Sequence, residues 1–343
     1  MKFYFIDIKK PYLFQHIVNR FDYEFDNIEN YKGGVGVFVI STDQVHDNDW
    51  VKFVSQSNNL IYLLDDGPEG YCHILRREYT RFYDVLDANN INRNRGIISY
   101  NNSIKNGITY YSDYNITTLY TPTFALYPFN EWMDMKTTVT PHYDYSYLVR
   151  NGKPHKELAY LKIKRKKLNI LLTYKENRKF NDDSIIDDVD GDLLDEFQFH
   201  LKPEVYYSSK INFTVESEYE SFYGNPNWFD NMMHLSEKTY RNLSYGLPFV
   251  LIGNKNSLNH LRELGFKTFD CFIDESYDSM ESDIRMDAAI TAGVDLLKYY
   301  DTDKMKDILK YNQTLMYDDI YMGNIFKKYV IDELKKHMNN LEY

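Results

Sequence analysis

Cysteine, glycine, proline and long apolar runs are all scarce in this chain of 343 residues. The two cysteines, Cys72 and Cys271, cannot form a disulfide framework and lack metal-ligand spacing, so we expect buried thiols in a reducing compartment. Fifteen glycines and nine prolines exclude a collagen-like chain. No window reaches the roughly 18 apolar residues of a membrane-spanning helix, and the charged N-terminus is unlike a signal peptide. We therefore expect a soluble, cytoplasmic protein without membrane contact.

Positive charge is in deficit as well. The chain has 40 Lys and Arg against 51 Asp and Glu, a net charge of -11. Nucleic-acid binders gain affinity when Lys and Arg replace the counterions of the phosphates, so this chain as a whole would be repelled. The basic residues of the N-terminal part are interspersed with acidic ones; they are Arg76, Arg77, Arg81, Arg93 and Arg95. We expect no tight binding to duplex DNA.

Aromatic residues are abundant. The chain has 33 Tyr, 21 Phe and 3 Trp, and 43% of its residues are hydrophobic, which excludes a disordered chain and allows a sizeable core. At about 150 residues per domain, the length suggests two domains. The tyrosine excess is typical of a genome rich in A and T, so we do not interpret it as a binding surface.

Short buried strands dominate residues 1–144, which we assign to an N-terminal α/β lobe. Runs of β-branched and aliphatic residues bounded by turn residues predict strands at 35–40, 59–64, 96–100 and 108–111. Few convincing helices accompany them, so we expect a less regular sheet here. The Pro-, Thr- and aromatic-rich stretch 121–141 is the candidate crossing between domains.

Strands and helices alternate after Tyr145, which predicts βαβ units and a parallel sheet. The expected strands are 145–149, 169–174, 211–215, 248–252 and 268–272, and the expected helices are 155–168, 236–245 and 257–264. We assign residues 145–300 to a second, Rossmann-like lobe. Residues 301–343 are assigned to C-terminal helices on their amphipathic pattern.

The segment from Ser236 to Gly253 has the features of an anion-binding helix. Ser236 is a good N-cap, and Gly246 can provide the left-handed C-terminal cap before the strand at 248–252. A helix N-terminus presents free N–H groups and the positive end of a dipole, so it attracts phosphate. Lys238 and Arg241 would add full charges, and Glu237 could accept hydrogen bonds from a ribose.

Glu216 and Ser217 lie about twenty residues earlier, at the end of a predicted strand. Ligands of parallel α/β sheets bind beyond the carboxyl ends of the strands, where Glu216 and the start of the helix at Ser236 would both lie. A second cationic turn, Arg150-Asn151-Gly152-Lys153-Pro154, follows the strand at 145–149 and precedes a helix, so it is another anion-site candidate.

The order of these motifs resembles the donor-binding domain of GT-B glycosyltransferases, in particular the fucosyltransferase-like group and related phage-encoded transferases. The resemblance rests on Glu216-Ser217, on Ser236-Glu237-Lys238, and on the glycine and proline positions Gly246, Pro248 and Gly253. It covers roughly residues 145–285. It implies two Rossmann-like lobes facing a cleft, C-terminal helices that fold back toward the first lobe, and a viral protein of the host cytoplasm.

The resemblance also implies a reaction: transfer of a sugar from a nucleotide-diphosphate donor to an acceptor hydroxyl, with no obligatory metal or cofactor. Lys238, with Arg150 or Lys153, would then stabilise the diphosphate. Glu216 or Glu237 would hold the ribose. Ser217 and Ser236 would offer hydrogen bonds, and Arg241 would add charge. The acceptor could be a glycan, a protein or a nucleobase, and the sequence assigns neither the catalytic base nor the stereochemistry.

Two alternatives remain open. The acidic run from Asp187 to Asp192 contains overlapping D-x-D patterns, which in GT-A glycosyltransferases hold a divalent cation against the donor. In that interpretation Asp188, Asp190 and Asp192 would bind Mn²⁺, although we favour a solvated acidic loop. The other alternative is a viral binding or structural module that has a transferase-like fold and no activity.

Overall fold

The computed structural model describes residues 1–6, 13–41, 44–45, 50–54, 59–65, 77–100, 102–103, 108–111, 116–126, 139–149, 153–174, 203–217, 219 and 233–341. Arg150, the acidic run Asp187–Asp192 and Cys72 lie outside these residues. The predictions made for them therefore stay predictions.

The chain divides into two units. Unit 1 comprises Met1–Tyr127 together with Asp318–Tyr343, and unit 2 comprises Pro128–Tyr317. These boundaries differ from the predicted ones, which lie at 144/145 and 300/301. The first boundary falls inside the predicted crossing at 121–141, and the C-terminal helices are shared between the two units. The cleft between lobes stays a prediction.

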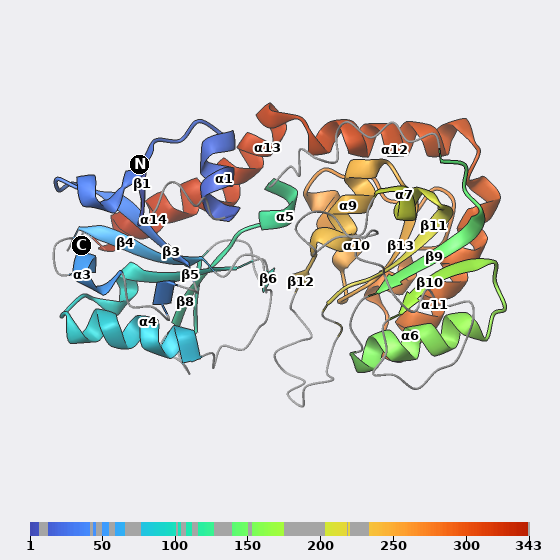
Figure 1. Cartoon of the computed structure of the whole chain (residues 1–343), viewed down its shortest axis with the longest axis horizontal. Helices are drawn as coiled ribbons and strands as arrows, with labels where there is room; N and C mark the ends of the chain where they lie inside the picture. Colours follow the sequence, from blue (N-terminus) through green and yellow to red (C-terminus); the bar gives the residue numbers. More distant parts are fainter. Residues whose placement is uncertain are drawn as a thin grey trace. The chain divides into compact units, whose positions relative to one another are not determined.

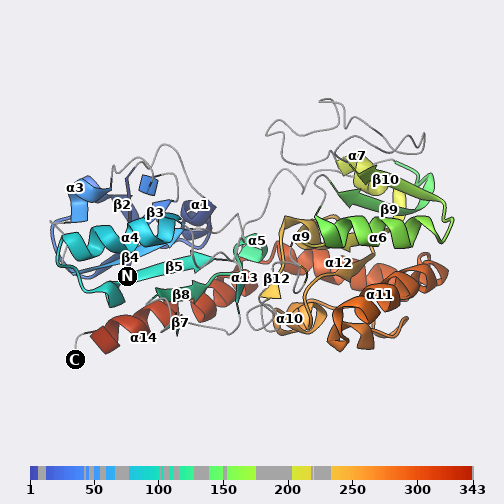
Figure 2. The same ribbon diagram turned by 90° about the horizontal axis from the view of Figure 1, so that it is seen from below.

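Unit 1 contains a seven-stranded sheet of order β2-β1-β3-β4-β5-β8-β7. Six strands run parallel and only β7 is antiparallel, paired with β8, so the sheet is more regular than its sequence suggested. The central strands are uninterrupted apolar runs because helices cover both faces; α4 (Arg77–Ala88) and α14 (Asp332–Leu341) lie on opposite sides in Figure 2. The strands are β1 (Lys2–Phe5), β2 (Phe25–Asn27), β3 (Gly36–Ser41), β4 (Leu60–Asp65), β5 (Gly96–Tyr100), β7 (Ile108–Tyr111) and β8 (Ile116–Tyr120), and the remaining N-terminal helices are α1 (Leu13–Arg20), α3 (Val51–Val54) and α5 (Thr123–Leu126).

The end of the chain is part of the core of unit 1. Phe326, the last residue of α13 (Asp319–Phe326), is fully buried against the rings of Phe14, Phe21 and Tyr23. Tyr329 packs edge-on against Tyr120 of β8. Aromatic contacts between residues far apart in the sequence thus fix the C-terminal helices to unit 1. The expectation that C-terminal helices return to the first lobe is confirmed for α13 and α14.

Unit 2 contains a four-stranded, fully parallel sheet of order β10-β9-β11-β13. Its strands are β9 (Tyr143–Val149), β10 (Ile170–Tyr174), β11 (Ser209–Val215) and β13 (Phe249–Ile252). Four of the five predicted strands are therefore present. Figure 1 shows α9 (Glu237–Tyr245) and α12 (Asp303–Met316) on one face of the sheet, and α6 (Pro154–Lys164) and α11 (Ser282–Leu296) on the other.

Alternation along β11 explains this layering. Phe213 points toward α11, where its ring meets Gly293, and it stacks on Tyr145 of β9 at 5.5 Å between ring centroids. The next residue, Thr214, points the other way and accepts a hydrogen bond from Asn242 of α9 at 2.8 Å. Successive side chains of a strand face opposite sides of the sheet, so each face receives its own helices.

Two local expectations are wrong. Residues 268–272 form turns, because the N–H of Phe272 bonds to the carbonyl of Phe269, only three residues away. Cys271, expected to be buried, lies exposed in this turn. Among the described residues, no helix is both long and apolar enough to cross a membrane.

Candidate functional site

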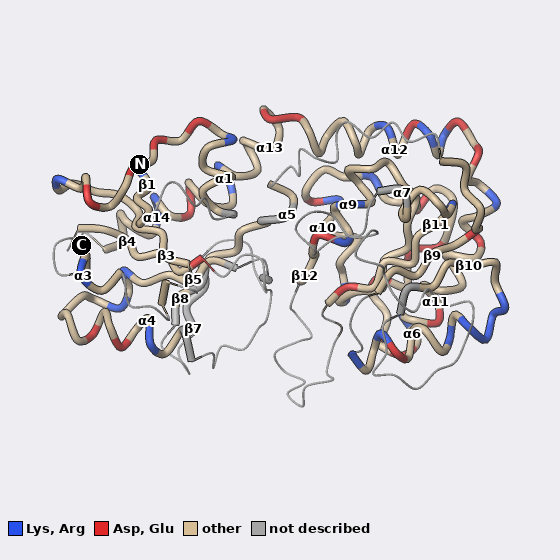
Figure 3. Tube along the Cα trace, viewed as in Figure 1, with Lys and Arg blue, Asp and Glu red and all other residues tan. Residues whose placement is uncertain are grey.

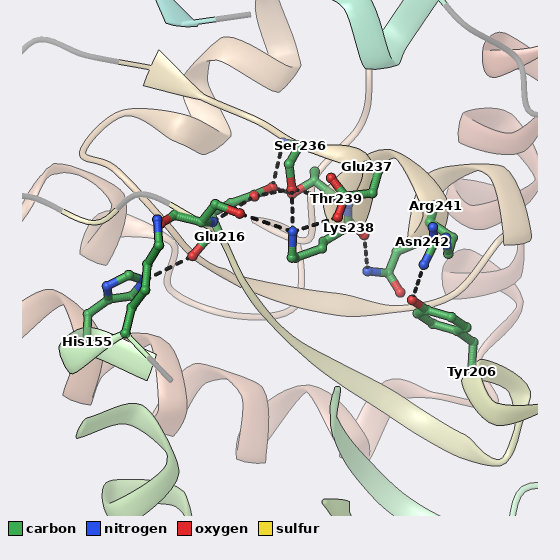
Figure 4. A network of polar contacts seen from close by, with 11 residues as sticks. His155, Tyr206, Glu216, Ser236, Glu237, Lys238, Thr239, Arg241 and Asn242 are labelled. Carbon is green, nitrogen blue, oxygen red and sulfur yellow. Dashed lines mark hydrogen bonds and ion pairs between the residues drawn. The ribbon is translucent and has the colours of Figure 1, made fainter. Parts of the chain in front are cut away.

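A buried carboxylate connects the end of β11 with the start of α9 (Figure 4). Glu216 has 0% of its surface exposed, and its oxygens accept hydrogen bonds from the N–H and hydroxyl of Ser236 and from the hydroxyl of Thr239. The N–H of Ser217 adds a fourth contact, at 3.3 Å. A carboxylate has about four acceptor positions, so these donors saturate it. Glu216 therefore fixes the helix start.

Both ends of α9 have the caps predicted from the sequence. Ser236 adopts the extended N-cap conformation, and its hydroxyl accepts from the N–H of Lys238 at 3.3 Å. At the other end, Gly246 has φ 64°, the left-handed conformation that glycine adopts without strain. The Lys238 ammonium donates to the hydroxyls of Ser217 and Ser236, at 3.1 and 3.2 Å, and pairs with Glu237 at 2.6 Å. A positive charge thus stands at a helix N-terminus that is itself positive.

The start of α6 meets this helix from the other side of β11. Lys153 is the N-cap residue of α6, Pro154 fills its first turn, and the Lys153 ammonium donates to the carbonyl of Ser217 at 2.8 Å. His155 contacts the carbonyl of Glu216 at 3.0 Å. Because a carbonyl only accepts, the Nε2 atom of His155 carries the proton. Two helix starts, α6 and α9, therefore converge on Glu216 and Ser217.

Lys156 is the member of this group that sequence analysis did not assign. The residue is only 4% exposed, and charges act on its ammonium without a side-chain hydrogen bond or ion pair among the described residues. Burial, followed by the charges of Lys238 and Lys153, lowers the pKa of Lys156 to about 8, against the opposing effect of Glu216 and Glu237. A buried ammonium that no carboxylate contacts directly is unfavourable in the absence of a ligand.

The neighbouring groups have pKa values set by the same environment. Burial lowers the pKa of His155 to about 4, and the cations Lys156 and Lys153 act in the same direction, so the ring is neutral at pH 7. For Lys238, burial is the largest influence and would lower the pKa, but Glu237 and Glu216 outweigh it and raise the pKa above its ordinary value. Lys238 stays charged over the whole physiological range.

The loop after β13 contributes a buried amide to the same edge of the sheet. A Cβ on Gly253 would lie 3.4 Å from Glu216, so this loop runs beside the Glu216 carboxylate. Next to it, Asn254 is 1% exposed, and neither its Oδ1 nor its Nδ2 has a partner among the described residues. Buried polar atoms are nearly always hydrogen-bonded, so this amide marks an unfilled hydrogen-bonding position.

Arg241 lies apart from the group around Glu216. In Figure 4 its guanidinium points toward Tyr206 of α7 (Pro203–Tyr207), to whose hydroxyl it donates. It is 2% exposed and lies over the Tyr206 ring. The structure thus brings together six of the eight residues predicted for donor binding, namely Lys153, Glu216, Ser217, Ser236, Glu237 and Lys238, and places Arg241 elsewhere, while Arg150 is outside the described residues.

The other buried carboxylates of unit 2 have structural partners. Glu275 pairs with Arg262 at 2.5 Å and accepts from the N–H of Phe269 at 2.7 Å. Asp278 accepts from the N–H groups of Leu258 and Asn259, both at 3.0 Å, at the start of α10 (Ser257–Glu263). The described residues contain no group of three or more His, Cys, Asp or Glu side chains suited to a metal ion.

Unit 1 has polar side chains at the carboxyl edge of its own sheet. Ser41, Asp65 and Ser99 are paired in register across β3, β4 and β5. Asp65 is 5% exposed and is the one acidic residue buried among the described residues of this unit. This edge is where ligands of parallel sheets bind, so Asp65 is a second functional candidate.

Comparisons with known proteins give structural likenesses and no sequence relative. No family model matches the chain, and no curated protein matches it in sequence. Among solved structures, the chain is similar to one described as the DNA-modifying enzyme β-glucosyltransferase, crystallised with and without its substrate uridine diphosphoglucose. The TM-score is 0.47 at 11% identity, over 99% of this chain and 100% of that one.

Proposed function

We propose that the chain is a glycosyltransferase that transfers a sugar from a nucleotide-diphosphate donor to an acceptor hydroxyl. The observation that supports this most is the convergence of Lys153 and Lys238 on Ser217, at the N-terminus of α9 and the carboxyl edge of a parallel sheet. Fixed cations and N–H groups of this kind attract a diphosphate.

In the proposed reaction the acceptor oxygen bonds to the anomeric carbon while the bond from that carbon to the diphosphate breaks. The acceptor proton passes to a base, and the nucleoside diphosphate leaves with the bonding electrons. Negative charge therefore grows on the leaving group, and cations already held in place stabilise it without reorganising. We propose that Lys238 and Lys153 supply this stabilisation and that no metal is obligatory.

The two acids predicted to hold the ribose take different roles in this proposal. Glu216 is saturated by protein donors and fully buried, so it positions Ser236 and does not reach the ligand. Glu237 keeps 22% of its side chain exposed and pairs with Lys238. We assign hydrogen bonding to the ribose to Glu237.

We propose that the base is none of the buried acids of unit 2. Glu216, Glu275 and Asp278 have structural partners, and His155 is a weak base because burial lowers its pKa to about 4.

Donor binding provides the first test. We expect thermal-shift screening with UDP-, GDP- and CMP-sugars to identify the nucleotide, and calorimetry to show at least tenfold weaker binding for Lys238→Ala. Lys166→Ala is the matched control, because Lys166 is an exposed lysine just after α6. Lys238→Ala that binds and transfers as wild type does would refute the proposal.

Two further outcomes separate the alternatives. Loss of transfer in EDTA, restored by Mn²⁺, would favour the GT-A interpretation and the acids Asp188, Asp190 and Asp192. Donor binding without transfer to any acceptor would favour the non-catalytic module.

The acceptor is a hydroxyl on a glycan, a protein or a nucleobase, and we propose that duplex DNA is not bound tightly. In Figure 3 acidic and basic residues are interspersed in both units. Arg93, one of the candidates for DNA contact, pairs with Asp87 at 2.9 Å and lies over the ring of Tyr83. A salt-sensitive gel shift at sub-micromolar protein, lost in the Arg93 and Arg95 variants, would contradict this expectation.

A further inference from the structure

The most unusual group in the described part of the chain is the Lys156 ammonium. Lys156 lies in the first turn of α6, and only 4% of the residue is exposed. Charges act on its ammonium without a side-chain hydrogen bond or ion pair among the described residues. Lysines are almost never fully buried unless they are paired. The side chain therefore requires an explanation that the protein alone does not supply.

The charges around Lys156 do not neutralise it. From its own helix it faces Lys153, from α9 it faces Lys238 and Glu237, and from the end of β11 it faces Glu216. Glu237 is already paired with Lys238, and Glu216 is saturated by hydroxyl and N–H donors. Three ammonium groups thus share a site whose two carboxylates have other partners.

The remaining neighbour on α6 carries no compensating charge. His155 is neutral at pH 7 and donates to the Glu216 carbonyl, and its ring stacks on Tyr219 at 5.6 Å between centroids. The helix start adds positive character, since the first N–H groups of α6 point toward its N-terminus. All these features favour an anion with more than one negative charge.

We propose that Lys156 couples anion binding at this site to protonation: di- or polyphosphate binds the protonated ammonium tightly and the neutral amine weakly. The nucleoside diphosphate of the proposed reaction would then be bound more tightly at pH 7 than at pH 9. This inference rests on the proposed function for the identity of the ligand. The coupling itself requires only a phosphate-bearing anion.

The strength of the coupling follows from linkage. Burial and the neighbouring cations lower the pKa of Lys156 to about 8. If the bound anion keeps it protonated beyond pH 9, the contribution of Lys156 to affinity falls about tenfold between pH 7 and pH 9. A glutamine at this position has no such dependence.

The experiment uses inorganic pyrophosphate with the full chain. Calorimetry at pH 7 and pH 9 compares wild type with Lys156→Gln, and the exposed Lys166→Gln is the control. We expect the ratio of the two dissociation constants, variant over wild type, to fall about tenfold across this range. Because the ratio is used, protonation of pyrophosphate itself cancels.

A second measurement uses only the wild-type protein, so it does not depend on whether a variant folds. In ¹³C-lysine NMR of the wild type, one lysine should titrate near pH 8 without ligand and at least one unit higher with saturating pyrophosphate. A constant ratio, or the absence of a lysine that moves with ligand, overturns the inference. If pyrophosphate binding depends on pH through Lys156 but no nucleotide sugar binds, the inference stands and the proposed function is refuted. If the protein transfers sugar from a nucleotide sugar but Lys156 causes no pH dependence, the proposed function stands and the inference is refuted.

Discussion

Replacing Lys156 by methionine should stabilise the protein while it weakens anion binding. The pKa of a free lysine, 10.5, falls to about 8 here because of burial and of the nearby Lys238 and Lys153. The unfolded chain therefore binds more protons than the folded chain between about pH 8 and pH 10.5. The free energy of unfolding therefore rises with pH across that window. Below pH 8 the folded protein bears the full free-energy cost of burying the charged ammonium.

The size of the penalty follows from the same shift. About 2.5 pKa units at 1.36 kcal/mol each is about 3 kcal/mol at pH 7, for a side chain that is 4% exposed. Methionine matches the length of the alkyl chain and has no charge, so Lys156→Met should recover on the order of 2–3 kcal/mol at pH 7.

Urea unfolding followed by circular dichroism at pH 7 and pH 10 is the assay, with Lys166→Met as the exposed control. We expect the gain to shrink strongly at pH 10, where wild-type Lys156 is neutral in the folded protein. A Lys156→Met variant that gains no free energy of unfolding at pH 7, or gains equally at both pH values, would refute this reasoning. Either result would show that burying the Lys156 charge costs the folded protein no stability.

Three other outcomes follow from the described contacts. Between pH 6.5 and pH 4 the wild type should lose up to about 3 kcal/mol, because the depressed pKa of His155 means that the unfolded chain takes up a proton first; His155→Gln should remove this loss in acid urea titrations. Glu216→Gln should lower the free energy of unfolding by about 3 kcal/mol, since an amide NH₂ would face the donors of Ser236; unfolding unchanged in urea would contradict the network. Gly293→Ala should cost about 1–3 kcal/mol in the same assay, because its Cβ would overlap the Phe213 ring, whereas a neutral result would mean that α11 can move away from the sheet.

Much of unit 2 could be predicted from local pattern. The strands around 145–149, 169–174, 211–215 and 248–252 are β-branched or aliphatic runs bounded by turn residues, and each is present in the sheet. The caps of α9 were predicted because they depend on single residues, Ser236 and Gly246, whose side-chain chemistry or backbone freedom acts locally.

Predictions from local sequence pattern failed where tertiary contacts determine the secondary structure. The segment 268–272 resembles a strand in composition, yet the carboxylate of Glu275 binds the N–H of Phe269 and Arg262 binds Glu275, so the chain turns. The sequence pattern predicts a less regular sheet in unit 1 than the structure has, for a related reason. Its order brings β5 between β4 and β8, and strand order of this kind has no signal within one strand.

The site shows the same division between local and long-range information. Glu216 and Ser236 were recognisable as a pair because both follow short motifs at strand and helix ends. Which way each side chain faces depends on the register of β11 against β13, where the N–H of Glu216 bonds to Ile252 at 3.0 Å. That register turns Glu216 inward, where it is saturated as a support for α9, and so leaves ligand contact to other groups.

Lys156 was not predicted as a site residue because what sets it apart is the lack of a direct ion-pair partner among the described residues, which the sequence does not reveal. In the sequence it is one of many lysines in and after a basic helix, with Lys162, Lys164 and Lys166 as neighbours. The packing of α6 beside Glu216 and α9 buries Lys156 among cations and among carboxylates that already bind other groups. A fold that tolerates such a penalty in the free state gains selectivity for an anion, because the ligand supplies the charge that the protein lacks. The same reasoning explains why stability and anion binding should respond in opposite directions when Lys156 is replaced.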